Sequence, residues 1–588
     1  MTTSRFAVRP ALAMAFGLTL AAVASPEAGA GQSRAESIDQ LLERYHALRQ
    51  FNGSALIAER GEVILSRGYG LANFEWSVPN ASDTRFRVGS ITKQFTAVIV
   101  LQLVEEGALA LDGRIVDYLP GYPRPQGELV TIHQLLNHTS GIPSYTGFPG
   151  FMEDDVRDPF EPDSLVALFA GLPLEFEPGS RFRYNNSAYV LLGLIIERVT
   201  GRPYAQVLRE RVLDPSGLAA TGYDHEEEIR KRGASGYVRT LDGYENAPYL
   251  DSSIPYAAGM MYSTVEDLYG WDQVLYSDAL FRDPASKEAM FTPGLEDYGH
   301  GFFVRDTTAG DPGPAVRVFE HGGGIFGFST IFRRFPADRH AIVLIDNTGG
   351  DLRPIVDGIT AILYGQPPAE PRASVAERLL PIAERNGADA VRNRYLQLLR
   401  DAEDEYVFGP GELNGLGWHL VEVGDIETAV GVLEFNLEYH PDDPGAHGAL
   451  GEARRATGDT NAAVAHFETA LALNGRFQQA RQSLTELGVP IDPSLAEGLR
   501  LPEEKLDRYA GRYEVGPDLT LTVTREDDRM YAQVTDQDRY EISARSETRF
   551  FLRGVRGFEL EFHGESDGPA ESVTLFEEGR QTLAPRIR

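Results

Sequence analysis

The chain has 588 residues, of which 42 % are hydrophobic. It can therefore build several cores, and we expect about three or four domains. The formal net charge of −32 repels phosphate backbones and anionic lipids, which disfavours nucleic acid and membrane surfaces as partners. There is no cysteine, which excludes disulfides, thiolate catalysis and thiolate metal sites.

The first 30 residues have the pattern of an export signal. Two arginines precede an almost unbroken apolar run at residues 11–24, and Ala28-Gly29-Ala30 fits a small-residue cleavage site. The run is shorter than the about 20 residues needed to span a bilayer. We therefore expect residues 1–30 to be a cleaved signal peptide and the mature chain to be periplasmic or secreted, without stable membrane insertion. An uncleaved N-terminal anchor is the alternative.

The next stretch mixes helices and strands. Residues 36–49 have the spacing of an amphipathic helix, and residues 54–70 that of a β-hairpin with β-branched residues on both sides of a turn. Mixed elements continue to about residue 365, and the polar, proline-rich stretch 365–374 is typical of a linker. We expect the first folded domain to span residues 31–366.

A repeat with a period of 34 residues follows this linker. Gly424-Asp425 and Ala429 recur as Gly458-Asp459 and Ala463. The pattern resembles a pair of tetratricopeptide repeats, in which small residues let paired helices approach each other. It is imperfect, because Gly475 stands where a second proline is usual. We expect a helical segment over residues 374–490. It is either a spacer packed on its neighbours or a groove for a protein or peptide partner.

Beyond residue 505 the hydrophobic period changes to two. Residues 519–524 and 558–562 each place alternate apolar side chains on one face. We predict a small antiparallel β-barrel or sandwich over residues 500–588, with about 80 ordered residues. Its opening, Tyr509–Tyr513, resembles the barrel appended to some bacterial D-aminopeptidases and penicillin-binding-protein-like hydrolases, and it carries no visible catalytic set.

Ser90 and Lys93 stand at the start of a strongly apolar helix within residues 87–107. Residues three apart share a helix face, so we expect these two side chains to project together. The first turn of a helix favours developing negative charge, and burial lowers the pKa of an ammonium group. The pattern predicts a nucleophilic Ser90 with Lys93 as a neutral base within reach. The apolar surroundings disfavour the alternative, two polar residues on a solvated face.

Two further segments carry groups suited to acyl chemistry. Tyr184-Asn185-Asn186 precedes another apolar helix, for which Asn186 or Ser187 is the expected N-cap. His321 and the glycines 322–324 interrupt a strand-like segment, where a ligand can approach the backbone and meet a main-chain N–H group. These glycines also fit G-x-G-x-x-G. Strand-like residues follow them, however, where a dinucleotide fingerprint needs a helix.

The ordered triplet S-x-x-K, Y-x-N and H-x-G resembles that of the serine β-lactamase and penicillin-binding-protein superfamily. Over about residues 36–365 the chain is most similar to the branch of class C β-lactamases, D-alanyl-D-alanine carboxypeptidases, D-aminopeptidases and esterases. Residues 135–143 (LLNHTSGIP) and 257–268 support this resemblance. It implies an α+β fold (an α/β sandwich) in which helices flank an antiparallel sheet, joined to an all-α domain, with the site in the cleft between them.

The resemblance also implies roles for individual residues. An acyl-enzyme forms on Ser90, Lys93 and Tyr184 share acid–base duty, the N–H groups of Ser90 and Gly324 form the oxyanion hole, and substrate is bound by Asn186, His321 and Gly323. Most β-lactamases have lysine at the position of His321, and a partly charged histidine favours peptidases and esterases. No cofactor or metal is expected. His133 and His138, five residues apart, do not share a helix face and are expected to be structural.

Three functions remain at this point. The first is an acyl-transferring serine hydrolase acting on D-amino-acid peptides, amides or esters. The second is a β-lactamase that hydrolyses β-lactam amides. The third is a catalytically silent peptide- or peptidoglycan-binding protein that uses the helical repeats. The presence of Ser90, Lys93, Tyr184 and the oxyanion glycines favours a hydrolase, whereas the loops that set the acyl and leaving groups are not readable from these motifs.

Overall fold

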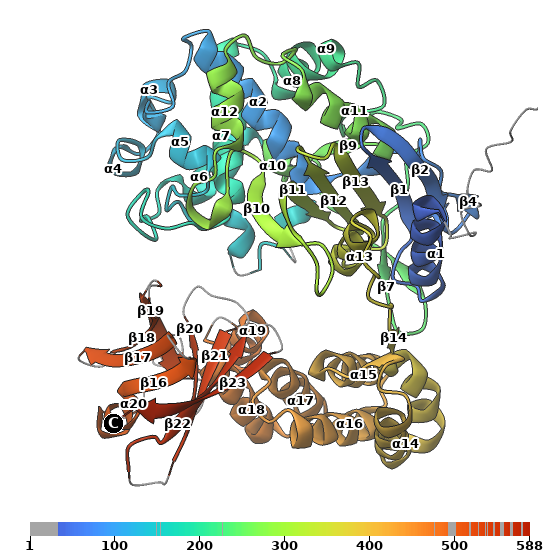
Figure 1. The fold of residues 1–588 in the computed structure, drawn as a ribbon, viewed down its shortest axis with the longest axis vertical. Coiled ribbons are helices and arrows are strands. Elements are labelled where there is room, and N and C mark those ends of the chain that lie inside the picture. The colour runs from blue at the N-terminus through green and yellow to red at the C-terminus, as the bar shows by residue number, and fades with distance from the viewer. Residues whose placement is uncertain are drawn as a thin grey trace, which may run out of the picture.

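The computed structural model describes residues 33–588 except 149, 153–154, 226, 476, 492–500, 502, 517–518, 527–528, 536, 538, 545–546, 553–557, 565–567, 578–579 and 588. The predicted signal peptide lies outside the described residues. An N-terminal part of strands and helices is followed by a helical segment and a β-barrel (Figure 1). Within the described ranges, none of the helices combines the length and apolar content that a membrane span requires.

A six-stranded antiparallel sheet forms the centre of the N-terminal part, in the order β10-β11-β12-β13-β1-β2. The predicted hairpin supplies two of its strands. The first chain segment pairs with the last one, since Gly53 lies opposite Asp346 and Ala58 opposite Ala341. The strands are β1 (Gly53–Glu59), β2 (Glu62–Tyr69), β10 (Phe303–Thr308), β11 (Ala315–Ile325), β12 (Phe328–Phe335) and β13 (His340–Asp346).

Helices cover both faces of this sheet (Figure 1). Alternation along the strands turns Ile57 and Leu344 toward one core, and Leu56 and Val343 toward the other. The first core is covered by α1 (Arg34–Ala47) and α13 (Arg353–Leu363). The second is covered by α2 (Thr92–Glu105), α5 (Ile132–Leu136), α6 (Pro162–Ala170), α7 (Asn186–Thr200), α10 (Tyr256–Gly259), α11 (Val265–Tyr276) and α12 (Pro284–Phe291). The predicted α+β class, with helices flanking an antiparallel sheet, is confirmed.

The helical segment contains two similar helix pairs, α15–α16 and α17–α18. Their starts are 34 residues apart, at 410 and 444 and at 426 and 460. A Cβ added at Gly417 or Gly451 would come within 2.4 Å of Leu433 or 2.5 Å of Phe467, so only glycine allows these helices to pack so closely. The tetratricopeptide assignment stays a prediction. The helices are α14 (Val375–Asp401), α15 (Pro410–Glu422), α16 (Ile426–Tyr439), α17 (Pro444–Ala456), α18 (Thr460–Leu473) and α19 (Gln478–Glu486).

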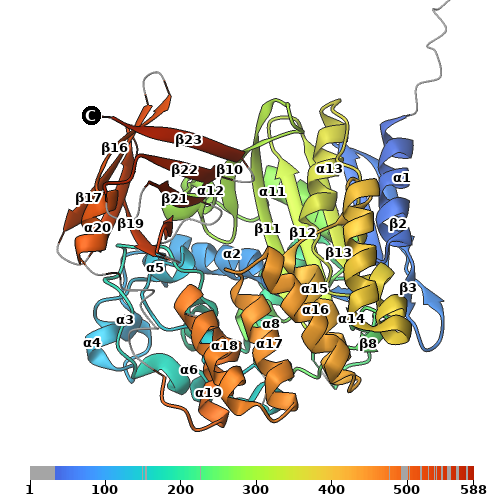
Figure 2. The same cartoon turned by 90° about the horizontal axis from the view of Figure 1, so that it is seen from below.

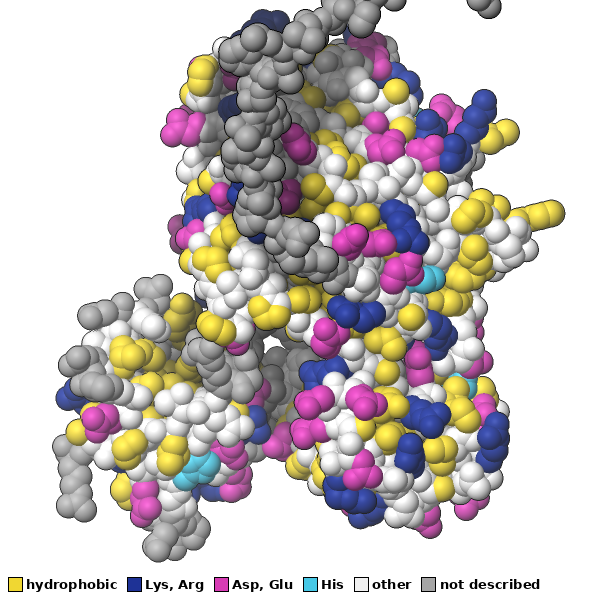
Figure 3. All heavy atoms as spheres, turned by 45° about the vertical axis from the view of Figure 1, so that its right-hand side comes forward, with side chains coloured by type: hydrophobic (Ala, Val, Ile, Leu, Met, Phe, Trp, Pro, Cys, Tyr) yellow, Lys and Arg dark blue, Asp and Glu magenta, His cyan; other side chains and the backbone are white. Residues whose placement is uncertain are grey.

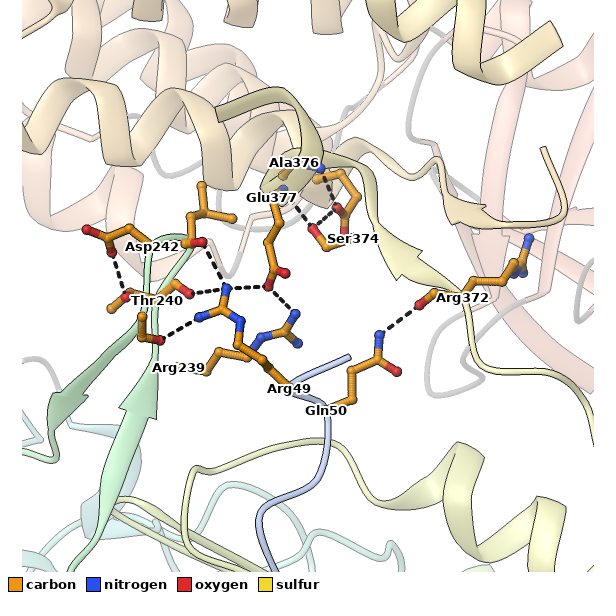
Figure 4. Close-up of polar contacts among 12 residues, drawn as sticks. Arg49, Gln50, Arg239, Thr240, Asp242, Arg372, Ser374, Ala376 and Glu377 are labelled. Atoms are coloured by element: carbon orange, nitrogen blue, oxygen red, sulfur yellow. Dashed lines mark hydrogen bonds and ion pairs between the residues drawn. The ribbon is translucent and has the colours of Figure 1, made fainter. Parts of the chain in front are cut away.

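A cluster of polar contacts joins the helical segment to the N-terminal part (Figure 4). Glu377, near the start of α14, forms ion pairs with Arg49, at 2.8 Å, and with Arg239. Arg49 also donates hydrogen bonds to the carbonyl oxygens of Leu241 and Gly243, at 2.9 and 3.0 Å. Arg49 therefore connects Glu377 of the helical segment to the segment 241–243 of the N-terminal part.

The C-terminal strands form a closed eight-stranded barrel. Of the two predicted alternatives, a barrel or a sandwich, the structure has the barrel. Closure pairs the first strand with the last, which leaves no open edge. Figures 1 and 2 place the barrel and the helical segment on the same side of the N-terminal part. The strands are β16 (Gly511–Gly516), β17 (Leu519–Glu526), β18 (Arg529–Val534), β19 (Arg539–Ala544), β20 (Arg549–Leu552), β21 (Phe558–His563), β22 (Ser572–Glu577) and β23 (Arg580–Ile587).

The surface carries charges of both signs despite the net charge of −32. On the face drawn in Figure 3, basic and acidic side chains are interspersed. Some charged side chains of the protein form exposed ion pairs, for example Arg198 with Asp163 at 2.6 Å. Because such exposed pairs contribute only about 0–1 kcal/mol each, folding depends mainly on the buried cores.

Candidate active site

Ser90 lies in a short 3₁₀ turn, Gly89–Ile91, directly before α2. Gly89 has a φ of +52°, and a Cβ there would lie 2.8 Å from the backbone nitrogen of Gly324. Glycine is therefore required where this turn meets strand β11. The sequence placed Ser90 in the first α-helical turn, whereas the structure places it in the 3₁₀ turn that leads into the helix.

Lys93 is fully buried and makes three polar contacts. Its Nζ lies 3.0 Å from Ser90 Oγ, 2.9 Å from Asn186 Oδ1 and 2.8 Å from the carbonyl oxygen of Ala258. Burial lowers the pKa of Lys93 well below its ordinary value. A neutral amine has two N–H groups and one lone pair. Since the two carbonyl oxygens can only accept, both N–H groups are used there and the lone pair faces the Ser90 hydroxyl.

Tyr184 precedes α7 by two residues, and its hydroxyl is buried with no hydrogen-bond partner among the described residues. Burial raises its pKa, and the nearby Ser90 side chain opposes that rise. The side chain of Asn185 caps α7, because its Oδ1 accepts from the N–H of Ala188 at 3.0 Å. The predicted N-cap, Asn186 or Ser187, was therefore wrong, and the Asn186 amide is free to contact Lys93.

His321 is buried in β11 and both of its ring nitrogens are engaged. Nδ1 lies 2.6 Å from the carbonyl oxygen of Gly322, so it carries the proton, and Nε2 accepts from the Tyr298 hydroxyl at 3.0 Å. Burial lowers the pKa of His321 to about 4. The sequence suggested a partly charged histidine that binds substrate. The structure instead has a neutral imidazole bound to Tyr298. Glu320 is paired with Arg333, at 2.5 Å.

The three glycines after His321 do not interrupt the strand, contrary to the prediction. β11 continues through them, with Gly322 opposite Ile331 and Gly324 opposite Ser329 in β12. Gly323 is buried, and a Cβ there would lie 2.0 Å from the carbonyl oxygen of Val88. Gly323 therefore allows close packing of β11 against the turn before α2, and its substrate-binding role stays a prediction. Gly324 is exposed, with open space where a side chain would be.

Sequence reasoning missed three participants in this geometry. Ala258 contributes only its carbonyl oxygen, which no side-chain signal marks. Tyr298 belongs to no motif that we recognised, although it is fully buried against His321. His138 was expected to be a structural residue, and its ring lies 4.3 Å from that of Tyr184. Among the residues that the structure describes, no group of three or more His, Cys, Asp or Glu side chains is arranged to hold a metal ion.

Comparisons with known proteins assign the N-terminal part to a family. The family model described as Beta-lactamase matches residues 38–364, and a domain of unknown function, DUF3471, matches residues 499–585. Penicillin-binding protein 4* of Bacillus subtilis is 31 % identical over 360 residues, covering 57 % of this chain and 77 % of that protein. Esterase EstB of Burkholderia gladioli is 31 % identical over 365 residues, covering 54 % of this chain and 91 % of the esterase.

A solved structure supports the same assignment. The penicillin-binding protein of Bacillus halodurans is 27 % identical to this chain, with a TM-score of 0.50. The match covers 56 % of this chain and 100 % of that structure. The family match extends over more than half of the 588 residues and contains Ser90, Lys93, Tyr184 and Gly324. The chain belongs to the β-lactamase family, and is a hydrolase-type protein related to penicillin-binding proteins and esterases.

Proposed function

We propose that this protein is an exported serine hydrolase that forms an acyl-enzyme on Ser90 from small esters, amides or peptides, with D-amino-acid substrates preferred. The contact set of Lys93 carries the proposal. Its Nζ lies 3.0 Å from Ser90 Oγ, and its other two partners are carbonyl oxygens. A buried neutral amine with its lone pair on a serine hydroxyl is the arrangement that an activated nucleophile needs. Export rests on the predicted signal at residues 1–30.

In the proposed acylation step, Ser90 Oγ attacks the substrate carbonyl carbon and its proton passes to Lys93 Nζ. The carbonyl oxygen becomes an oxyanion, to which the backbone N–H groups of Ser90 and Gly324 donate. The oxyanion then collapses, the bond to the leaving group breaks, and the leaving group takes a proton from Tyr184. The raised pKa of Tyr184 and the lowered pKa of Lys93 suit these opposite duties as acid and base.

The same groups serve the second half of the reaction, in which water hydrolyses the acyl-enzyme. In deacylation, water adds to the ester carbonyl and gives a proton to the Tyr184 phenolate, and the Lys93 ammonium returns its proton to Ser90 Oγ as the bond to the acyl group breaks. Asn186 holds Lys93 through Oδ1. Its Nδ2 lies 3.3 Å from Thr146 Oγ1 and faces away from the lysine, where it is available to the substrate acyl group. We assign Asn186 both duties.

The nature of His321 bears on the second candidate, a β-lactamase. A neutral imidazole that already binds Tyr298 offers no fixed positive charge to a substrate carboxylate. This favours uncharged esters and amides, and D-amino-acid amides in particular are suggested by the motif triplet that the chain shares with D-alanyl-D-alanine carboxypeptidases. For the third candidate, the contacts of Glu377 with Arg49 and Arg239 support a spacer function for the helical segment.

The proposal is tested by incubating the protein with p-nitrophenyl acetate, the p-nitroanilides of D- and L-alanine, and a fluorescent penicillin. We expect an ester adduct on the peptide that contains Ser90, detected by mass spectrometry, and faster turnover of the D- than of the L-anilide. Hydrolysis that persists in Ser90→Ala, or an adduct on a different serine, contradicts the proposed nucleophile. Faster turnover of penicillin than of either anilide supports the β-lactamase instead.

A further inference from the structure

His138 holds the chain on both sides of Tyr184. Its carbonyl oxygen accepts a hydrogen bond from the N–H of Arg183 at 2.9 Å. Its ring Nδ1 accepts a second one from the N–H of Asn185 at 3.1 Å. The residues immediately before and after the tyrosine are thus bound by one histidine, which fixes the backbone from which the phenol projects.

The His138 ring also packs on the phenol itself. The two ring centroids are 4.3 Å apart, and the rings of Tyr298 and Tyr189 lie 4.7 and 5.1 Å from the imidazole. His138 is fully buried. These aromatic neighbours leave its ring little freedom to move, so the ring forms a fixed wall for Tyr184.

The backbone of His138 is in an uncommon conformation. Its φ is +61°, in the left-handed region that residues other than glycine rarely adopt. Such a strained conformation persists only where the surroundings impose it. The strained backbone lets a single residue present both its carbonyl oxygen and its ring nitrogen to the segment 183–185.

His138 is not suited to be a base. Because Nδ1 accepts from a backbone N–H, a neutral ring carries its proton on Nε2, which is buried without a partner among the described residues. Burial, and the nearby charge that Lys93 carries when protonated, both lower the pKa of His138 well below its ordinary value. The imidazole therefore stays neutral and leaves proton transfer to Lys93 and Tyr184.

Building on the proposed function, we propose that His138 is a positioning residue that holds Tyr184 in place for proton transfer during acylation. It acts through two backbone hydrogen bonds and the ring contact, and does not touch the substrate. Its loss is therefore expected to slow the chemical step without weakening substrate binding.

Two variants separate the contacts. His138→Phe keeps a ring against Tyr184 and removes the acceptor for Asn185. His138→Asn removes the ring but keeps an acceptor and tolerates positive φ. Single-turnover hydrolysis of D-alanine p-nitroanilide gives the acylation rate constant and the apparent substrate affinity, and its aniline must take a proton from Tyr184 to leave. We expect His138→Phe to acylate about tenfold or more slowly with affinity changed less than about twofold, since small misplacements of catalytic groups cost large factors. His138→Asn is expected to lose less.

A double-mutant cycle tells positioning from a general loss of structure. In a Tyr184→Phe background, His138→Phe and His138→Asn should cause no further loss, because the group that they position is already absent. His340→Phe is the matched control. His340 is also buried, and its Nδ1 also accepts a backbone N–H, from Arg60 at 3.0 Å, but it lies on β13 away from the site. This variant should acylate at the parent rate.

The results separate this inference from the proposed function. An equal loss in the parent and Tyr184→Phe backgrounds, or no loss at all, overturns the positioning role. A loss in His340→Phe equal to that in His138→Phe also overturns it, because general destabilisation then explains both. If His138→Phe does not fold, as judged by circular dichroism, His138→Asn completes the cycle. Absence of an acyl-enzyme in the parent protein refutes the proposed function instead.

Discussion

Lys93 Nζ lies 3.0 Å from Ser90 Oγ, with the amine fully buried and the serine partly accessible. The proposed base is thus removed from water, while the proposed nucleophile remains open to a substrate. Because burial disfavours the ammonium form, it lowers the pKa of Lys93 and favours the neutral amine. This relationship underlies the first two predictions.

Ser90→Ala is expected to abolish covalent labelling by fluorophosphonate or penicillin probes while the protein stays folded. The hydroxyl contacts Lys93, and no side-chain cap depends on it at the 3₁₀ turn. Loss of one such hydrogen bond costs about 1 kcal/mol. Labelling followed by mass spectrometry and circular dichroism checks both parts. Ser66→Ala, on the exposed side of β2, is the control that should retain labelling.

Lys93→Met is expected to reduce the acylation rate nearly as much as Ser90→Ala, because members of one catalytic unit are not additive. The parent rate should fall as pH falls through the lowered pKa of Lys93, since protonation removes the lone pair that faces Ser90. Burst kinetics across pH measure both effects. A loss of less than about tenfold would show that Tyr184 alone acts as the base.

The lowered pKa of His321 predicts how the stability of the protein changes with pH. Its pKa is about 4 in the folded protein and ~6.5 when unfolded, so the unfolded chain binds the proton first as pH falls. The stability that the neutral ring contributes is present above ~6.5 and is lost as pH falls toward about 4, by up to ~1.4 kcal/mol per pH unit. Urea unfolding at several pH values should show a smaller loss in His321→Asn. The exposed His563, replaced by Asn, should leave the loss unchanged.

Gly323 and Gly324 form a matched pair. A Cβ at Gly323 meets the Val88 carbonyl oxygen at 2.0 Å, whereas nothing lies within 4 Å of one at Gly324. Gly323→Ala should therefore destabilise the protein by about 1–3 kcal/mol through overpacking, and Gly324→Ala should fold normally. Urea unfolding of both variants checks this. Equal stability would mean that the turn before α2 moves away from β11 at little cost.

Deletion of residues 374–588 is expected to leave a folded protein that still acylates small esters. The deletion removes Glu377, but Arg49 keeps the carbonyl oxygens of Leu241 and Gly243 as partners. Burst kinetics of the truncated chain should agree with those of the full-length Glu377→Gln variant. This substitution weakens only the ion pairs between the helical segment and the N-terminal part. A truncated protein that folds but does not acylate would show that the C-terminal parts complete the cleft.

The sequence alone determined the features that depend on local spacing. Ser90 and Lys93 are three positions apart, and at that spacing two side chains on a helical turn share a face wherever the helix is placed. The change of hydrophobic period from 3.6 to two likewise predicted a small antiparallel barrel or sandwich, and the period of 34 residues predicted repeated helices. These features need no knowledge of what the segment packs against.

The tertiary structure decided everything that depends on which distant groups meet. Two partners of Lys93, Asn186 and the carbonyl oxygen of Ala258, lie 93 and 165 residues away in the chain. The proton state of His321 follows from its burial against Tyr298, which no motif marks. The sequence did not show how deeply each glycine is buried, whereas packing against Val88 buries Gly323 and leaves Gly324 exposed. Burial and long-range contacts set desolvation and hydrogen-bond roles, and these arise only when the chain is folded.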